Sequence, residues 1–352
     1  MGKPKKISSW DCIVEKKGFF MIKKANTVRN LGERGLIRWF KDLITPFDGA
    51  LLSGIEDAVA VPWNGNALVV NSDMLVASTD VLPGMTPAEI GWKAGVMGLS
   101  DLAAKGAAPL GMIVSLGLPK DTEVNFAGAL VGGLNSVSRE HGTYYLGGDT
   151  NQCLELVIDC TVFGRVPQEK LMRRKGASPD DVIAVTGDFG YTGALFESVL
   201  NDRKKPAKVV EEIREKALHP RARIPEGNAL AEANAVSAAI DSSDGLAWSL
   251  YEIAAASRVG FHIDNLPIPS ICSKFATVHD LDVDDLALYG GEEFELVVTI
   301  PPDRWSKAFQ VVNKVGGNLI PIGKIVEASE KLLLKDGKEI SIEPRGYEHF
   351  SE

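Results

Sequence analysis

The chain has 352 residues and a formal net charge of −9, and this length is enough for two domains with hydrophobic cores of their own. A hydrophobic fraction of 45% and a charged fraction of 24% are ordinary for a globular protein. No basic tract could meet a nucleic-acid backbone, and no apolar run approaches the roughly 18 residues of a membrane helix, so neither nucleic acid nor a membrane is an expected partner. Because the basic N-terminus lacks the apolar core of a secretory signal, we expect a cytoplasmic protein.

The first half of the chain alternates strand-like and helix-like segments after an extension that we place at residues 1–28. Residues 67–79 are expected to form two short strands with a turn near Asn71-Ser72. Thr86-Pro87-Ala88-Glu89 is typical of a helix start, because Thr caps the helix, Pro fits its first position and Glu closes a capping box. We expect this helix to run to about Lys105 and to end at Gly106. Further segments follow in order: a strand at 111–118, a helix at 125–142, and strands at 143–148 and 154–164.

A turn-rich, charged passage at 165–181 is interpreted as the boundary between a domain of residues 29–165 and a second domain of residues 166–352. A strand, a glycine-spaced turn and several helices are predicted after it. A short strand at Ala238–Asp241 leads into a helix that Asp244 is expected to cap. Residues 332–342 are predicted to form a hairpin across Asp336-Gly337. The alternation predicts an α+β fold, with mixed α/β character, in two halves.

Acidic residues recur beside Gly, Ser and Thr, and several of them directly follow an apolar run. The set comprises Glu56-Asp57, Asp80 in STD, Asp101 in SDLAAKGA, Asp149 in GGDT, Asp241 and Asp244 in DSSDGL, and Glu292 in GGEEFEL. If these residues converge, they carry more negative charge than a protein leaves uncompensated. Divalent cations with a phosphate as further ligand are the usual solution. Each motif alone also has an ordinary explanation as a strand-end turn, a helix cap or a solvated loop.

Other kinds of site find no support in the sequence. The five histidines form no metal-ligand spacing, so zinc is not expected. The chain has no GxxxxGK[ST] loop and no GxSxG elbow, which excludes a P-loop enzyme and a serine hydrolase of that type.

Taken in order, the motifs resemble those of the thiamine-monophosphate kinases. These enzymes belong to an ATP-binding superfamily with aminoimidazole-ribonucleotide (AIR) synthetase, selenophosphate synthetase and a hydrogenase-maturation protein. The resemblance runs from LGERGLI at about residue 31 to GYEHF at 346–350. It implies a two-domain AIR-synthetase-like fold in which the N-terminal halves of two subunits form a barrel-like dimer core. It also implies an enzyme that uses ATP and Mg²⁺ to phosphorylate thiamine monophosphate, giving thiamine diphosphate.

The resemblance also implies a role for each matching position. The implied metal-binding residues are Asp57, Thr79, Asp80, Asp101, Asp149, Asp241 and Asp244, with Ser78 a weaker addition. The implied nucleotide-binding residues are Gly148, Asp149, Arg174 and Ser243. Glu292 and Tyr347 match positions that touch the thiamine group. Among the metal-binding residues, Asp80, Asp149 and Asp244 are expected to be catalytic.

Departures from the family pattern keep other functions open. Glu56 stands where family members have Asp, and Gly98 stands where they have Asn. The loop after Asp80 is shorter than in the family and lacks its substrate-contacting histidine. Because these changes affect the acceptor side most, a second hypothesis is a related phosphoryl-transfer enzyme that acts on another small molecule. A third hypothesis is a non-catalytic nucleotide-binding dimer.

Overall fold

The computed structural model describes residues 27–54 and 56–350, so the extension predicted at residues 1–28 lies almost entirely outside the described residues. The chain divides into two compact units, one with residues up to Asp48 and from Glu348 onward, the other with Gly49–Tyr347. The first unit contains the helices α1 (Val28–Leu31) and α2 (Glu33–Leu43). Within it, the His349 N–H donates to Glu33 Oε2 at 3.0 Å.

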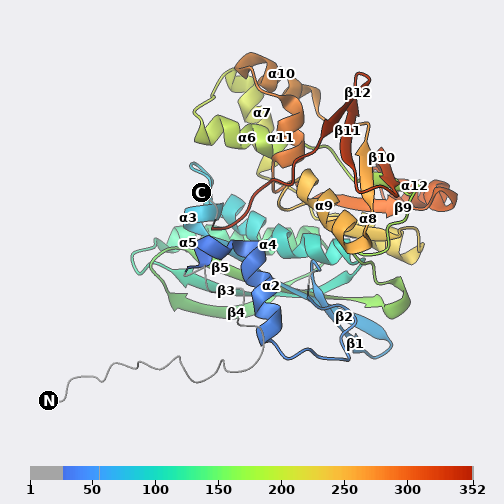
Figure 1. Cartoon of the computed structure of the whole chain (residues 1–352). Helices are drawn as coiled ribbons and strands as arrows, with labels where there is room; N and C mark the ends of the chain where they lie inside the picture. The colour runs from blue at the N-terminus through green and yellow to red at the C-terminus, as the bar shows by residue number, and fades with distance from the viewer. Residues whose placement is uncertain (1–26, 55, 351–352) are drawn as a thin grey trace. The chain divides into compact units, whose positions relative to one another are not determined.

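The second unit contains a five-stranded and a seven-stranded sheet, both mixed (Figure 1). The strand order of the five-stranded sheet is β1-β2-β5-β3-β4. Its strands are β1 (Val59–Trp63), β2 (Asn66–Val76), β3 (Ala108–Leu118), β4 (Tyr145–Gln152) and β5 (Val157–Pro167). Only β3 and β4 pair in parallel in this sheet of the described residues. The sheet is open, with β1 and β4 at its edges, so the described part of one chain does not form a barrel by itself.

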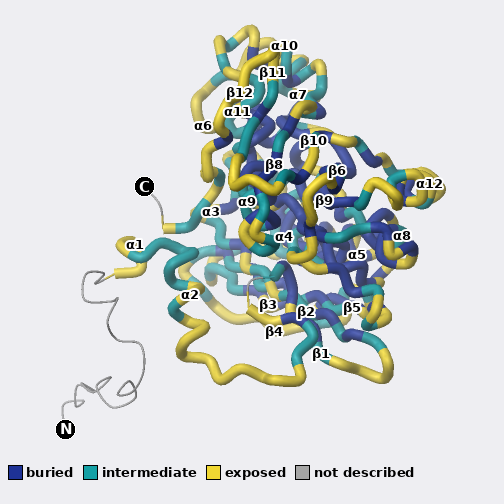
Figure 2. The backbone as a smooth tube through the Cα atoms, turned by 45° about the vertical axis from the view of Figure 1, so that its right-hand side comes forward, coloured by how far each residue is buried: buried dark blue, intermediate teal, exposed yellow. Residues whose placement is uncertain are grey.

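Two helices, α4 (Pro87–Ala104) and α5 (Val124–Glu140), accompany the five-stranded sheet. α4 packs against β2, β5 and α5, and also against β7, β9 and α8 of the second half. It is buried along most of its length (Figure 2). Large hydrophobic side chains are exposed on four strands of the sheet, namely Val59, Trp63, Met74, Leu110, Ile113 and Leu146. α4 is therefore the element shared by both halves of this unit.

The seven-stranded sheet has the order β12-β11-β8-β10-β6-β9-β7. Its strands are β6 (Val182–Val185), β7 (Ala238–Asp241), β8 (Gly260–Ile263), β9 (Leu296–Ile300), β10 (Ile320–Val326), β11 (Lys331–Lys335) and β12 (Lys338–Ser341). The α-helices of this half are α6 (Tyr191–Leu200), α7 (Ala207–Ala217), α8 (Ile224–Glu232), α9 (Leu246–Ser257), α10 (Ser270–His279), α11 (Val283–Tyr289) and α12 (Trp305–Lys314), and the 3-10 helices are η2 (Gln168–Lys170) and η3 (Pro302–Arg304). β9 is buried at every residue and β6 at every residue except Val182, as expected for strands covered on both faces.

Several local predictions are confirmed. Thr86 and Glu89 form a complete capping box at the start of α4. The helix ends in a Schellman motif, in which the Gly106 N–H bonds to Ala103 O and the Ala107 N–H bonds to Leu102 O. The predicted hairpin joins β11 and β12 with Lys335 opposite Lys338. No described helix has both the length and the apolar character that a membrane span requires.

Two predictions about local structure are wrong. The segment 67–79 is not two strands with a turn, because β2 continues to Val76 and the short helix α3 (Ala77–Asp80) follows. Asn71 and Ser72 pair with β5 inside a continuous ladder, and this long-range pairing outweighs their local turn preference. Asp244 does not cap α9 either, because the N-cap is Gly245 and no side chain makes a capping hydrogen bond.

Candidate active site

Three of the predicted carboxylates lie together in the second unit. Asp57 precedes β1, Asp101 lies in α4, and Asp241 ends β7. One carboxylate oxygen from each lies within 4.8 Å of the others, which is a spacing that could hold a metal ion. The Ser100 hydroxyl of α4 donates to Asp241 Oδ2 at 2.8 Å and ties β7 to the helix. The acidic centre is thus built from elements of both sheets and from the helix between them.

A fourth carboxylate, Asp73 of β2, hydrogen-bonds to Asp101. It is absent from the predicted set, although the hydroxyl and amide of Asn71-Ser72 just before it are a signal that could have identified it. Burial, together with the charges of Asp159 and Asp57, raises the pKa of Asp73. We define the acidic centre as Asp57, Asp73, Asp101 and Asp241.

The electrostatics of the acidic centre reflect crowded negative charge. Burial, followed by the charges of Asp241, Asp73 and Asp57, raises the pKa of Asp101 well above its ordinary value. Burial, with Asp57 as the next cause, raises the pKa of Asp241 to about 7. Carboxylates this close share protons or bind cations, because several full charges cannot stay uncompensated in a buried space. The centre therefore has the composition of a hard-cation site.

Asp57 differs from the other three because two cations contact it. Burial would raise the pKa of Asp57, but Lys105 and Arg174 lower it below its ordinary value. Lys105 Nζ lies 2.6 Å from Asp57 Oδ2. Arg174 donates from Nε to Asp57 Oδ1 at 2.8 Å and lies 3.7 Å from Glu252. Arg174, predicted to contact the nucleotide, therefore hydrogen-bonds to a carboxylate of the acidic centre in this structure.

Asp80 is not one of the three grouped carboxylates. Its Oδ2 accepts the Val76 N–H at 2.7 Å and the Thr79 hydroxyl at 3.0 Å. The buried Lys93 of α4 donates to the Asp80 carbonyl at 2.6 Å and forms an ion pair with Glu292. Burial raises the pKa of Glu292, and Lys93 opposes this shift. Asp80, Lys93 and Glu292 form a second polar group, which we call the Lys93 group.

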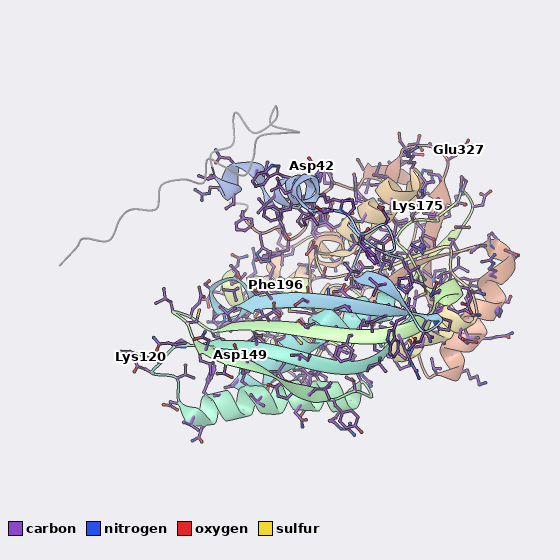
Figure 3. The ribbon with its side chains drawn as sticks, turned by 90° about the horizontal axis from the view of Figure 1, so that it is seen from below. Asp42, Lys120, Asp149, Lys175, Phe196 and Glu327 are labelled. Atoms are coloured by element: carbon purple, nitrogen blue, oxygen red, sulfur yellow. The ribbon has the colours of Figure 1, made fainter. Side chains whose placement is uncertain are left out.

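Of the remaining predicted residues, Ser243, Asp244 and Tyr347 are linked to Glu292 or to each other through backbone hydrogen bonds, whereas Ser78, Gly148 and Asp149 make separate contacts. The Glu292 N–H bonds to Ser243 O, and the Tyr347 N–H bonds to Asp244 O at 3.1 Å, so DSSDGL lies beside both predicted thiamine-contacting residues. Asp149 is exposed on β4, where its Oδ1 accepts the Thr150 N–H; Figure 3 labels it on the strands. Gly148 is required there, because a Cβ at this position would lie 1.7 Å from Val114 O. Ser78 donates its N–H to Glu155.

A pocket of about 320 Å³ opens beside the Lys93 group. Its lining includes Glu292, Glu293, Tyr191, His219 and Arg223. The volume is in the range of small-molecule sites, and the lining mixes aromatic, acidic and basic side chains.

Comparison with known proteins identifies the class. The model of the AIR synthase related protein N-terminal domain matches residues 55–166, and that of the C-terminal domain matches residues 178–335. The thiamine-monophosphate kinase of Pyrococcus horikoshii is 36% identical over 318 residues, covering 90% of this chain and 96% of that protein. The thiamine-monophosphate kinase of Escherichia coli K12 is 32% identical, covering 91% and 98%.

Solved structures agree with these matches. A structure described as "AaThiL complexed with AMPPCP and TMP" superposes with a TM-score of 0.80 at 26% identity, covering 92% of this chain and 98% of that chain. The protein tt0281 of Thermus thermophilus gives a TM-score of 0.81 at 31% identity, covering 90% and 100%. E. coli HypE, at 20% identity and a TM-score of 0.65, shares the fold.

The fold and the matches define a member of the AIR synthase related proteins with two domains of mixed α/β structure. Within that class, the chain belongs to the thiamine-monophosphate kinase family. The predicted resemblance is confirmed, and with it the prediction of an ATP-dependent kinase.

Proposed function

We propose that this chain is a Mg²⁺-dependent phosphotransferase that converts ATP and thiamine monophosphate to ADP and thiamine diphosphate. The observation that carries the proposal is the acidic centre, where oxygens of Asp57, Asp101 and Asp241 lie within 4.8 Å of one another. The likeness to the structure described as complexed with AMPPCP and TMP supports both substrates. Family members at 31–36% identity support the same reaction.

The acidic centre would hold the divalent ions. Bound Mg²⁺ would neutralise phosphate charge and align the reacting groups. The acceptor phosphate is already a nucleophile, so no strong general base is required, and positioning is the main task of the protein. The clustered carboxylates fit this chemistry, because hard oxygen ligands are what Mg²⁺ prefers. We infer that Asp73 takes the inner metal-binding role that the motif order implied for Asp80.

The acceptor would lie at the Lys93 group and the pocket beside it. Lys93 fixes the Glu292 carboxylate and the Asp80 carbonyl together, so the acceptor side is ordered although the family histidine is missing. Asp244, Ser243 and Tyr347 are joined to this side by backbone hydrogen bonds. Thr79, Gly148 and Asp149 keep their implied metal and nucleotide roles as part of the proposal.

We also propose a cytoplasmic homodimer with domains at residues 29–165 and 166–352. Exposed apolar side chains on the five-stranded sheet, such as Met74 at 56% exposure and Leu146 at 58%, support the proposal that a second subunit covers this sheet. An open sheet with two edges and an apolar face is a natural half of a shared core. The matched ranges, residues 55–166 and 178–335, support a boundary between them.

The test is an ADP-release assay with Mg²⁺, with and without thiamine monophosphate, followed by identification of thiamine diphosphate as product. Asp241→Asn should lower turnover by orders of magnitude while the far-ultraviolet circular dichroism stays unchanged. Asp264→Asn, outside the acidic centre, is the matched control and should keep wild-type turnover. ADP release only with another acceptor would replace the substrate assignment, and ATP binding without transfer to any acceptor would favour the non-catalytic dimer.

A further inference from the structure

Lys105 is a fully buried lysine next to the acidic centre. Its side chain has 0% exposure, and it is the C-cap residue of α4. It follows Asp101 by four residues, so both side chains lie on the same face of the helix. The phosphoryl transfer proposed for this chain assigns no role to Lys105.

The Lys105 ammonium contacts two carboxylates. Nζ donates to Glu56 Oε2 and lies 2.6 Å from Asp57 Oδ2. Glu56 Oε2 also accepts the Arg174 backbone N–H at 3.2 Å, and the Arg174 side chain bonds to the other oxygen of Asp57. The two neighbouring acids at 56 and 57 are thus held by protein cations.

The position of the ammonium is fixed by the backbone. The Schellman motif ends α4 at Lys105. The turn needs glycine at position 106, because its φ is +66° and a Cβ there would lie 2.3 Å from Ala231 Cβ. The carbonyls at a helix C-terminus favour a positive charge. A buried ammonium is costly unless it is paired with carboxylates, and here the pairing is with Glu56 and Asp57. Arg174, in contrast, keeps 17% side-chain exposure and could move toward an anion.

We propose that Lys105 is a permanent internal cation of the acidic centre, which supplies a positive charge that an additional divalent ion would otherwise bring. It holds Glu56 and one oxygen of Asp57 in place, and it leaves the other oxygen of Asp57, with Asp73, Asp101 and Asp241, for exchangeable metal ions. Lys105 is a positioning residue, because it acts through Asp57. The Glu at position 56 fits this role, since its oxygen reaches Lys105.

The test replaces Lys105 by Met, which keeps the chain length and removes the charge. We expect the metal-free Lys105→Met variant to melt at a lower temperature than wild type and Mn²⁺ to restore most of the loss. Mn²⁺ should bind at least about tenfold more tightly, or with one more ion per chain, because one cation has left a low-dielectric cluster. Mn²⁺ binding is followed by the electron paramagnetic resonance of the free ion.

Two variants serve as controls. Lys93→Met removes another buried, ion-paired lysine of α4. This variant should also melt at a lower temperature than wild type, but Mn²⁺ should raise its melting temperature by no more than it raises that of wild type. Lys105→Arg keeps the charge and should keep wild-type Mn²⁺ affinity. If Lys105→Met does not fold in metal-free buffer, its refolding yield is measured against Mn²⁺ concentration instead. We expect the yield to rise with Mn²⁺, and a yield that Mn²⁺ does not raise overturns the inference.

The inference rests on the proposed function in that the centre takes divalent ions, and the outcomes separate the two. Wild-type protein that binds no Mn²⁺ refutes the proposed function. Wild-type protein that binds Mn²⁺, with a Lys105→Met variant that binds the same number of ions equally tightly, refutes only the role of Lys105.

Discussion

The side chain of Glu293 contacts the N-terminal end of α6 and makes the stability of this protein depend on pH. Its Oε1 accepts the Gly190 N–H at 2.8 Å and the Thr192 N–H at 3.1 Å. Burial raises the pKa of Glu293 from an ordinary 4.5 to about 7, although these two N–H groups lower it. Since the pKa is raised on folding, the protonated form stabilises the fold, and this stabilisation is lost as the pH rises from about 4.5 to about 7.

The magnitude follows from the size of the shift. A pKa raised from 4.5 to about 7, at about 1.4 kcal/mol per pH unit, corresponds to roughly 3 kcal/mol, most of which is lost between pH 5 and pH 8. Glu293→Gln keeps an oxygen for the two N–H groups and removes the titration. The free energy of unfolding of this variant, relative to wild type, should therefore rise by roughly 2 to 3 kcal/mol from pH 5 to pH 8.

Urea unfolding at pH 5, 6.5 and 8 measures this difference. Because the other buried carboxylates titrate in both proteins, subtracting the wild-type free energy of unfolding at each pH removes their contribution. Glu339→Gln, an exposed position of β12, controls for the loss of one charge. A difference between Glu293→Gln and wild type that stays constant within about 0.5 kcal/mol over this range would refute the reasoning.

Three further predictions concern metal binding and packing. Asp73→Asn removes a partly buried carboxylate with a raised pKa. Turnover in the ADP-release assay should fall at least about a hundredfold, while urea unfolding of the metal-free protein should show equal or higher stability; a less stable variant contradicts this. Thr86→Ala breaks the capping box and should cost about 1 kcal/mol in urea unfolding with kcat unchanged. Gly91→Ala places a Cβ 2.1 Å from Leu130 O and should cost about 2 kcal/mol, whereas Gly128→Ala, with open space around it, should cost nothing; equal costs would exclude the packing argument.

Local structure in this chain could be predicted where its signal lies within a few residues. The capping box at Thr86 and the stop at Gly106 are such signals, because their hydrogen bonds join residues no more than five apart. The turn expected at Asn71-Ser72 does not form, because this segment pairs with β5, whose residues bonded to Ser72 lie 87 to 89 positions further along the chain. Propensity at two residues cannot outweigh a ladder that runs the whole length of β2.

The same long-range pairing explains why the candidate site was predicted only in part. Motif order pointed to Asp57, Asp101 and Asp241, and the structure brings these three together. Once β2 is one strand, Asp73 reaches the acidic centre, whereas Asp80 follows in α3 beside Lys93. The departure at Gly98 also has a spatial reason, since a Cβ there would lie 3.0 Å from Asn71 Oδ1. None of these contacts is local in sequence.

α4 carries a side chain to each part of the proposed site, with Lys93 at the acceptor end and Asp101 and Lys105 at the metal end. A helix rises about 1.5 Å per residue, so it sets about 12 Å between the backbone positions of Lys93 and Asp101. One inserted residue between them would turn the later side chains by about 100° away from their partners. The number of residues in this helical segment therefore fixes both the separation and the relative direction of the side chains at the two ends of the proposed site.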